Sequence, residues 1–124
     1  MRAGEIVALR PDHISGSVAH LPHTKNGTAR DVPLSSNALA LLAELPDDRL
    51  FNLSSPSLDA LFRKMRKKAG IQNLTFHDAR HESITRLSQK LDVLALARMV
   101  GHKDIRMLSI YYNESAADLA RRLG

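Results

Sequence analysis

The dipeptide Asn26-Gly27 constrains the fold of this chain more than any other feature. Asn-Gly is the strongest short hairpin signal, because both residues tolerate the positive φ angles that a type I′ turn demands. The segment 18–34 therefore predicts two antiparallel strands joined around this turn, and a third short strand is expected near 13–15. We expect a small antiparallel sheet near the start of the chain.

The other segments have the spacing of helices. Residues 3–10 have the pattern of a helix end, because helices usually stop before the residue that precedes a proline, here Pro11. Capping residues and glycine stops mark the later helices. These helices are expected over 37–44, from Ser55-Pro56 to Gly70, over 78–89, from Asp92 to Val100 with Gly101 as the stop, from Asp104 to Tyr112, and from Ser115 onward. The sequence predicts an α+β domain, mainly helical, in which the small antiparallel sheet packs with a helical bundle.

One expected helix carries an apolar stripe at helical spacing, formed by Leu58, Leu61, Phe62 and Met65. Aromatic residues make up only 4% of the chain and there is no Trp, so the core is expected to be mostly aliphatic. We predict that this stripe belongs to the core and is not a cofactor site.

The composition excludes several classes of protein. A length of 124 residues suits one domain with a buried core. The chain has no cysteine, which excludes a disulfide framework, a cysteine nucleophile and a thiolate metal site. Its apolar runs are only a few residues long, and its start lacks the long apolar stretch of a signal peptide. We expect a cytoplasmic protein with no membrane role.

The chain carries an excess of positive charge. Its 18 Lys and Arg residues outnumber its 13 Asp and Glu residues, for a net charge of +5. Such a balance is typical of nucleic-acid binders. A basic run on a helix is as often a solvated face as a phosphate contact, so the run alone favours neither reading. This run lies in the expected helix 56–69 and contains Arg63, Lys64, Arg66, Lys67 and Lys68.

Chemically versatile side chains lie in four separated segments. Residues three apart in a helix share one face, so Arg2 can join Glu5 and His77 can join Arg80 in one site. Taken singly, each residue also has an ordinary explanation, such as a surface ion pair, a turn lysine or a packed histidine. The remaining candidates stand at the hairpin turn, after a helix stop and near the end of the chain: Lys25, His102, and the adjacent Tyr111 and Tyr112.

Together these side chains form a cationic set without a carboxylate cluster. Arginine suits non-bridging phosphate oxygens, because its planar fork donates two hydrogen bonds and keeps its charge. A tyrosine nucleophile must lose a proton of pKa about 10, which neighbouring cations favour. Histidine can accept that proton, and lysine can protonate a departing alkoxide. The set therefore favours phosphodiester chemistry without a metal ion or another cofactor, since two-metal nucleases need converging carboxylates.

Four motifs carry a resemblance to a known family. In chain order they are "RAGE", "TKNGTARDVPLS", "HDARH" and "GHKDIRMLSIYYN". They resemble the first arginine motif, the lysine hairpin, the His-x-x-Arg box and the Gly-His segment with its nucleophile in the tyrosine recombinase, or phage integrase, family. Each motif alone is weak, but the ordered set is highly specific. The chain resembles the C-terminal catalytic domain of that family.

The resemblance implies a role for the residues that would surround a phosphate. Arg2 and Arg80 would hold the scissile phosphate, and His102 would donate a hydrogen bond to it. Glu5 would brace the site, and His77 would assist proton transfer.

The resemblance also chooses between the two tyrosines, which periodicity leaves equal. In relatives the nucleophile follows the Gly-His histidine by nine residues, which selects Tyr111 and leaves Tyr112 as the expected packing residue. Lys25 would be the general acid toward the leaving 5′-oxygen. The implied product is a 3′-phosphotyrosyl link with a free 5′-hydroxyl, formed without a cofactor.

The implied partners are double-stranded DNA and other protomers of the same recombinase. The basic helix 56–69 would contact the DNA backbone. The last helix, with Leu119, Ala120 and Leu123 on one side, resembles the segment that docks into a neighbouring protomer. The remaining histidines are expected to be structural or to lie on the surface: His13, His20, His23 and His81.

The resemblance covers a catalytic domain over residues 1–124, without the N-terminal core-binding domain and the opening catalytic helices of the family. A catalytically silent DNA-binding remnant is therefore one alternative function. A relative of type IB topoisomerases that relaxes DNA is another, and a helical protein-interaction domain is a third.

Overall fold

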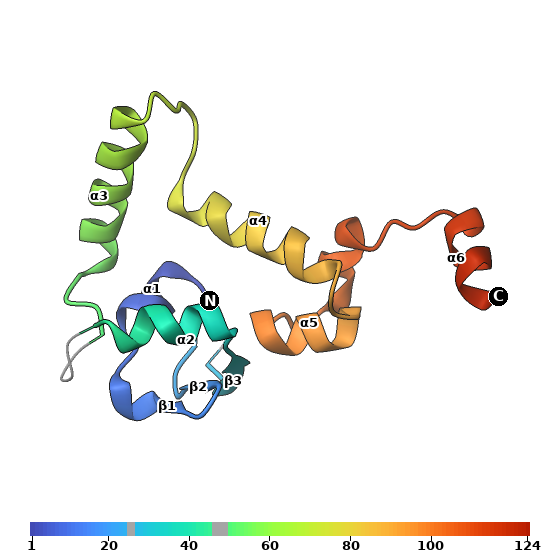
Figure 1. Cartoon of the computed structure of the whole chain (residues 1–124), viewed down its shortest axis with the longest axis horizontal. Coiled ribbons are helices and arrows are strands. Elements are labelled where there is room, and N and C mark those ends of the chain that lie inside the picture. Colours follow the sequence, from blue (N-terminus) through green and yellow to red (C-terminus); the bar gives the residue numbers. More distant parts are fainter. Residues whose placement is uncertain (25–26, 46–49) are drawn as a thin grey trace.

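The computed structural model describes residues 1–24, 27–45 and 50–124. Helices dominate these residues, and three short strands accompany them (Figure 1). The strands are β1 (Ile14–Ser15), β2 (Val18–Leu21) and β3 (Arg30–Pro33); the α-helices are α1 (Ala3–Val7), α2 (Ser36–Ala43), α3 (Ser55–Lys68), α4 (Phe76–Ser88), α5 (Val93–Val100) and α6 (Ala116–Leu123); the 3₁₀ helices are η1 (Pro11–His13) and η2 (Ile105–Tyr111). The predicted fold class, mainly helical with a small antiparallel sheet, is confirmed.

The three strands form an antiparallel sheet in the order β1-β2-β3. Both predicted hairpin strands and the third strand are present. The pairing of β2 with β3 ends at Leu21 and Arg30, so the strands do not reach the Asn-Gly turn as the sequence suggested. Gly27 has the expected positive φ of 77° and donates its N–H to the Thr24 carbonyl at 2.9 Å. Asn26 lies outside the described residues.

A first hydrophobic cluster lies on one face of this sheet. Alternation along β2 and β3 buries Ala19, Leu21 and Val32, and Leu9 and Leu50 complete the cluster. Leu42 of α2 and Met99 of α5 pack against it. This cluster fixes the sheet relative to the segment that begins the chain.

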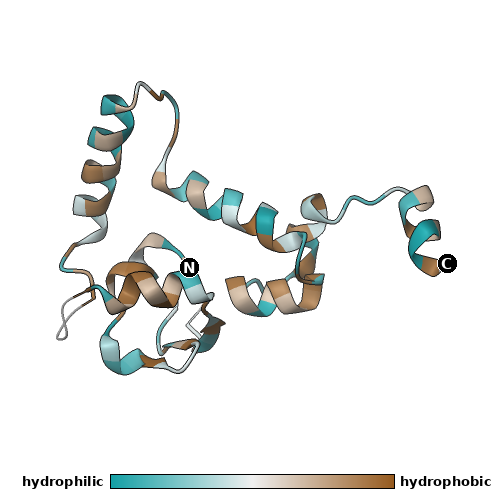
Figure 2. Ribbon diagram, in the orientation of Figure 1, coloured by the Kyte–Doolittle hydropathy of each residue, from teal (hydrophilic) through white to brown (hydrophobic). Residues whose placement is uncertain are grey.

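A second hydrophobic cluster joins α4, α5 and η2. Its buried members are Ile84, Leu96, Ala97, Val100 and Leu108. The ribbon of α5 is largely hydrophobic, which fits its position between α4 and β3 (Figures 1 and 2). Because α5 contacts both β3 and α4, it connects the two clusters.

Helix α3 corrects the prediction that its apolar stripe is core. No residue of α3 is buried, and Leu61 and Met65 are 46% and 69% exposed. Phe62 makes an edge-to-face contact with Phe76, with ring centroids 5.6 Å apart. Periodicity identifies the apolar face of a helix, whereas burial depends on what packs over that face.

Helix α6 lies away from the other elements, at the end of an extended segment (Figure 1). Its apolar residues Leu119 and Leu123 are exposed. Among the described residues, no helix has both the length and the apolar character needed to cross a membrane.

Candidate functional site

The short helix α1 brings Arg2 and Glu5 together. The Glu5 carboxylate accepts the backbone N–H of Arg2 at 2.6 Å and thereby caps the start of α1. Glu5 is 8% exposed, so its charge needs a partner inside the protein. Arg30 supplies it, with two hydrogen bonds of 2.6 and 2.8 Å to the two carboxylate oxygens.

Arg30 is a site residue that the sequence analysis missed. It lies on β3 two residues before the buried Val32, so both side chains belong to the same, inward face of the strand. An arginine on the inward face of a strand indicates a buried partner of opposite charge. The alternation of inward and outward residues along β3 therefore identifies Arg30 as a candidate from the sequence. The Nε of Arg30 also donates to the Met99 carbonyl of α5 at 3.1 Å. Arg30 therefore ties α1, β3 and α5 to one another.

The pKa of Glu5 reflects these contacts. Burial raises the pKa of the carboxyl, but the hydrogen bonds from Arg30 and from the Arg2 N–H outweigh burial and hold the pKa below its usual value. Glu5 is thus a fixed negative charge at neutral pH, and it offsets part of the positive charge around it.

Helix α4 carries Arg80 into the interior. The side chain of Thr75 accepts the Asp78 N–H at 3.2 Å, while Asp78 accepts the Thr75 N–H at 2.7 Å, and this capping box starts α4 two residues before the predicted position. Arg80 is buried, and its Nη2 donates to the Val100 carbonyl at 3.0 Å. The guanidinium therefore lies at the C-terminal end of α5.

The end of α5 sets the position of His102. Gly101 has a φ of 78°, the left-handed conformation that ends a helix, and the His102 N–H returns to the Ala97 carbonyl at 3.1 Å. This helix end places His102 two residues after Val100, whose carbonyl accepts the hydrogen bond from Arg80.

Three buried nitrogen atoms distinguish this region. They are Nη1 of Arg2, Nη1 of Arg80 and Nδ1 of His102, and none has a hydrogen-bond partner within the described part of the chain. A buried polar atom without a partner is costly to keep, and each such atom calls for an explanation. The two arginine nitrogens are donors, and the histidine Nδ1 is a donor in one of its tautomers, so each of the three can donate a hydrogen bond to an anion.

The electrostatics show that these groups lie close enough to affect one another. Burial lowers the pKa of His102, and the positive charges of Arg80, Arg2 and Arg30 lower it further. Burial and Arg2 lower the pKa of Arg80 as well. Arg2, Arg30 and Arg80 thus concentrate positive charge in this region, and the Glu5 carboxylate offsets part of it.

The surface around these groups is divided into adjoining hollows. His77 and Arg80 line a hollow of about 230 Å³, and Arg30 and His102 line another of about 400 Å³. Arg2 and Glu5 line a third of about 580 Å³. Arg2, Arg80 and His102 thus line three separate hollows and do not share one enclosed cavity.

The two adjacent tyrosines have different environments, although both pack against the second hydrophobic cluster. The hydroxyl of Tyr112 donates to the Leu91 carbonyl at 2.6 Å, and burial raises its pKa. The hydroxyl of Tyr111 lies 3.3 Å from Nδ1 of His81. Tyr111 is also within electrostatic range of Arg80. Tyr111 is therefore the tyrosine on the side of the cationic groups.

The two histidines of α4 contact each other. The His77 and His81 rings meet edge to face, with centroids 4.8 Å apart. Both residues are exposed, as the sequence analysis expected for His81. The sequence analysis did not anticipate the contact of His81 with Tyr111, although His77 and His81 are four residues apart and share a helix face. Lys25, the remaining candidate, lies outside the described residues.

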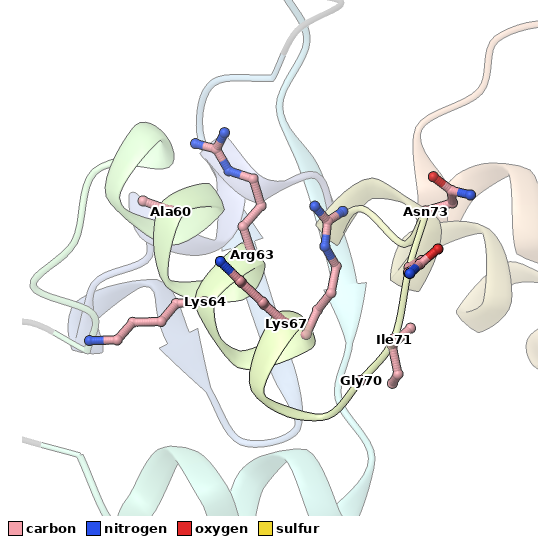
Figure 3. Close-up of a pocket in the computed structure, with 9 residues that line it drawn as sticks. Ala60, Arg63, Lys64, Lys67, Gly70, Ile71 and Asn73 are labelled. Carbon is pink, nitrogen blue, oxygen red and sulfur yellow. The ribbon is translucent and has the colours of Figure 1, made fainter.

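The basic run of α3 forms a separate surface, which consists of Arg63, Lys64, Lys67 and Lys68 on exposed positions. Arg63, Lys64, Lys67 and Asn73 line a hollow of about 740 Å³, and Figure 3 shows these side chains, with Lys64 extending away from Asn73. Arg66 differs, because it is half-buried and its Nη1 donates to the Leu74 carbonyl at 2.5 Å. Arg66 therefore holds the connection from α3 to α4.

No group of three or more His, Cys, Asp or Glu side chains that could hold a metal ion is found in residues 1–24, 27–45 and 50–124. The unpartnered buried donors described above belong to two guanidinium groups and one imidazole. Chemically, the arrangement suits an anion.

Comparison with known proteins gives a consistent result. The sequence matches the phage integrase family over residues 1–118. A Haemophilus influenzae protein named "Putative integrase/recombinase" is 47% identical over 131 residues, which cover 99% of this chain and 43% of that protein. The "Shufflon-specific DNA recombinase" of Escherichia coli is 39% identical over 130 residues, which cover 99% of this chain and 34% of that protein. The chain spans less than half the length of these relatives.

Solved structures share the fold. The crystal structure of XerA recombinase has a TM-score of 0.73 and 22% identity, over 98% of this chain and 50% of that chain. The XerH site-specific recombinase, in a pre-cleavage complex with its difH substrate, has a TM-score of 0.70 and 21% identity, over 97% of this chain and 41% of that chain.

Proposed function

This chain belongs to the phage integrase family of tyrosine recombinases, and on that premise we propose that it cleaves and rejoins DNA strands in site-specific recombination or integration. We propose that residues 1–124 act as the catalytic domain. The related "Shufflon-specific DNA recombinase" and the DNA-bound XerH structure support a DNA substrate.

The observation that carries this proposal is the set of unpartnered buried nitrogens on Arg2, Arg80 and His102. A scissile phosphate in the transition state gathers negative charge on its equatorial oxygens. Two guanidinium groups and an imidazole would donate to those oxygens, in positions fixed before the substrate arrives. Glu5 binds the Arg2 backbone and Arg30, and Arg30 binds the Met99 carbonyl. These contacts would hold Arg2 at a fixed position relative to the end of α5.

Tyr111 is the proposed nucleophile. Its oxygen forms a bond to phosphorus while the bond from phosphorus to the 5′-oxygen breaks, which leaves a 3′-phosphotyrosyl link and a free 5′-hydroxyl. His77 assists proton transfer through its contact with His81, and Lys25 protonates the leaving oxygen. A partner strand's hydroxyl reverses the step, so no ATP or cofactor is required. The raised pKa of Tyr112 and its bond to Leu91 favour a packing role for that residue.

The basic face of α3 is the proposed contact with the DNA backbone. Arg63, Lys64, Lys67 and Lys68 are exposed and neutralise phosphates without reading sequence. Arg66 contributes mainly by holding the segment that leads into α4.

Helix α6 is the proposed contact between protomers. Leu119 and Leu123 are exposed on a helix that packs on no other element in Figure 1. An apolar stripe of this kind gains stability when another surface covers it. We expect a neighbouring protomer on the same DNA to provide that surface.

Covalent trapping tests the function. The probe is a pool of randomised duplexes with a single nick, so that the short fragment released by cleavage diffuses away and the protein stays attached. The native chain and Tyr112→Phe should form an adduct that resists denaturation, and Tyr111→Phe should not. Adduct formation by Tyr111→Phe but not by Tyr112→Phe would reassign the nucleophile.

The same assay separates the alternative functions. Salt-sensitive DNA binding without any adduct would identify a silent DNA-binding remnant. Relaxation of supercoiled plasmid of arbitrary sequence would identify a topoisomerase. Absence of DNA binding at low salt would contradict the proposal as a whole.

A further inference from the structure

His81 is the hydrogen-bond partner that the structure gives to the Tyr111 hydroxyl. Its Nδ1 lies 3.3 Å from the phenolic oxygen, and no other described residue forms a hydrogen bond with that oxygen. A general base works within about 2.6–3.2 Å of the group it deprotonates, and such contacts are commonly longer before substrate binds. The distance is therefore suitable for proton transfer.

The titratable groups of the candidate site differ in their ability to take a proton from Tyr111. Arg80 stays protonated at neutral pH and has no acceptor atom. The carboxylate of Glu5 is occupied by Arg30 and by the Arg2 N–H. His77 contacts the ring of His81 and forms no hydrogen bond with Tyr111 in the described residues. His81 is the neighbour with both a free lone pair in its neutral form and direct contact.

We infer that His81 accepts the phenolic proton directly when Tyr111 attacks the phosphate, while His77 assists through its contact with the His81 ring. This inference rests on the proposed function. As the bond from the Tyr111 oxygen to phosphorus forms and the bond to the 5′-oxygen breaks, the proton moves to Nδ1 of neutral His81. The leaving oxygen takes its proton from the general acid, Lys25. In the joining step His81 returns the proton to Tyr111.

The surroundings of His81 suit this role. The neutral imidazole has one ring nitrogen with a lone pair, and in the tautomer that carries its proton on Nε2 this nitrogen is Nδ1. His81 is exposed, so its Nε2–H can face water and the captured proton can exchange with solvent. The edge contact with His77 holds the His81 ring, and the packing of Tyr111 on the second hydrophobic cluster holds the phenol.

The variant His81→Ala tests the inference on the nicked DNA pool described above. His81 is exposed, so the variant should fold, and Glu82→Ala is a matched control on the next exposed position of α4. We expect adduct formation to slow about 100-fold in His81→Ala and to stay unchanged in Glu82→Ala. Added imidazole should restore part of the rate in His81→Ala alone. A phenol of lower pKa, introduced as 3-fluorotyrosine at position 111, should also reduce the difference from the native rate.

Two results would overturn the inference in this assay. His81→Ala could form the adduct at the native rate, which would remove His81 from the reaction. It could also be slow without any rescue by imidazole or fluorotyrosine, which would make the role of His81 steric.

A measurement without DNA separates this inference from the proposed function. The ¹⁵N signal of His81 Nδ1 should shift when Tyr111 is changed to Phe, and should not shift in Tyr112→Phe. An unchanged signal in Tyr111→Phe would overturn the inference whether or not the native chain cleaves DNA. If the signal shifts but the native chain forms no adduct, the proposed function fails, and the contact between His81 and Tyr111 is one of packing alone.

Discussion

The guanidinium of Arg30 lies against Gly101 so closely that a Cβ atom at position 101 would come within 2.8 Å of Arg30 Nη1. The same guanidinium binds the Glu5 carboxylate, and His102 follows the glycine directly. Because Gly101 has no side chain, the guanidinium of Arg30 can lie directly against the end of α5 while it pairs with Glu5. Both sides of the proposed phosphate site depend on this close approach.

We predict that Gly101→Ala damages the fold and the site together. The left-handed φ of 78° costs a residue with a Cβ about 1–2 kcal/mol, and the contact with Arg30 adds to this cost. Urea unfolding should show a lower free energy of unfolding, and adduct formation should decrease because Arg30 is displaced.

Gly70→Ala is the matched control. Gly70 also has a left-handed φ, 73°, after the end of a helix, but a Cβ there meets no atom within 4 Å. Gly70→Ala should therefore lose stability through the backbone alone and keep its activity. Equal losses in the two variants would contradict the role given to the contact with Arg30.

The ion pair between Glu5 and Arg30 should contribute most to the free energy of unfolding at neutral pH. Both side chains are buried, at 7% and 9% exposure, so Glu5→Gln leaves an uncompensated guanidinium. We expect a loss of about 3 kcal/mol in the free energy of unfolding. The pKa of Glu5 is lowered in the folded chain, so the contribution of its charge is present above the unfolded pKa, 4.5, and is lost as the pH falls through the folded value.

Urea unfolding of the native chain and of Glu5→Gln over a series of pH values checks this prediction. The difference between the two proteins should shrink as the solution becomes acidic. A difference that does not depend on pH would show that the charge of Glu5 is not responsible.

His102 should report the binding of an anion. Burial and the guanidinium groups of Arg80 and Arg2 lower its pKa below 6.5, so the folded chain binds this proton less readily than the unfolded chain. Stability should therefore decrease as the pH falls below about 6.5, until the folded value is passed. An NMR titration of the His102 ring should give a midpoint below that of an unfolded peptide. Inorganic phosphate should raise the midpoint, because an anion stabilises the charged imidazole, and His20, paired with Asp31, serves as the internal control.

The basic face of α3 should determine how DNA binding responds to salt. Each phosphate contact that is removed reduces the slope of log K against log salt by about 1. The double variant of Lys64→Gln and Lys67→Gln should therefore reduce the slope by about 2, as measured by fluorescence anisotropy with random duplex DNA. Lys90→Gln, which removes one positive charge beyond the end of α4, should leave the slope nearly unchanged.

Local signals predicted most of the helix boundaries. Asp92, Asp104 and Ser115 cap the helices that follow them, as expected. Capping joins a side chain to a backbone N–H two or three residues later, so both partners are close together in the sequence. Helices α2 and α4 begin earlier than predicted, because Ser35 and Thr75 cap them.

Long-range relationships could not be predicted in the same way. The ion pair between Glu5 and Arg30 joins residues that are far apart in the sequence. The residues around either one do not indicate which residue is its partner. The contact between His81 and Tyr111 depends on how η2 packs against α4. The exposure of Met65 likewise depends on which surfaces meet α3. Periodicity describes one element, whereas these features belong to pairs of elements.

The two hydrophobic clusters have a consequence for the substrate. Arg2 belongs to the part of the chain built around the first cluster, and Arg80 and His102 to the part built around the second. A phosphate bound by all three residues would connect the part of the chain built around the first cluster to the part built around the second. The DNA substrate would then stabilise the arrangement of these two parts as well as react with the protein.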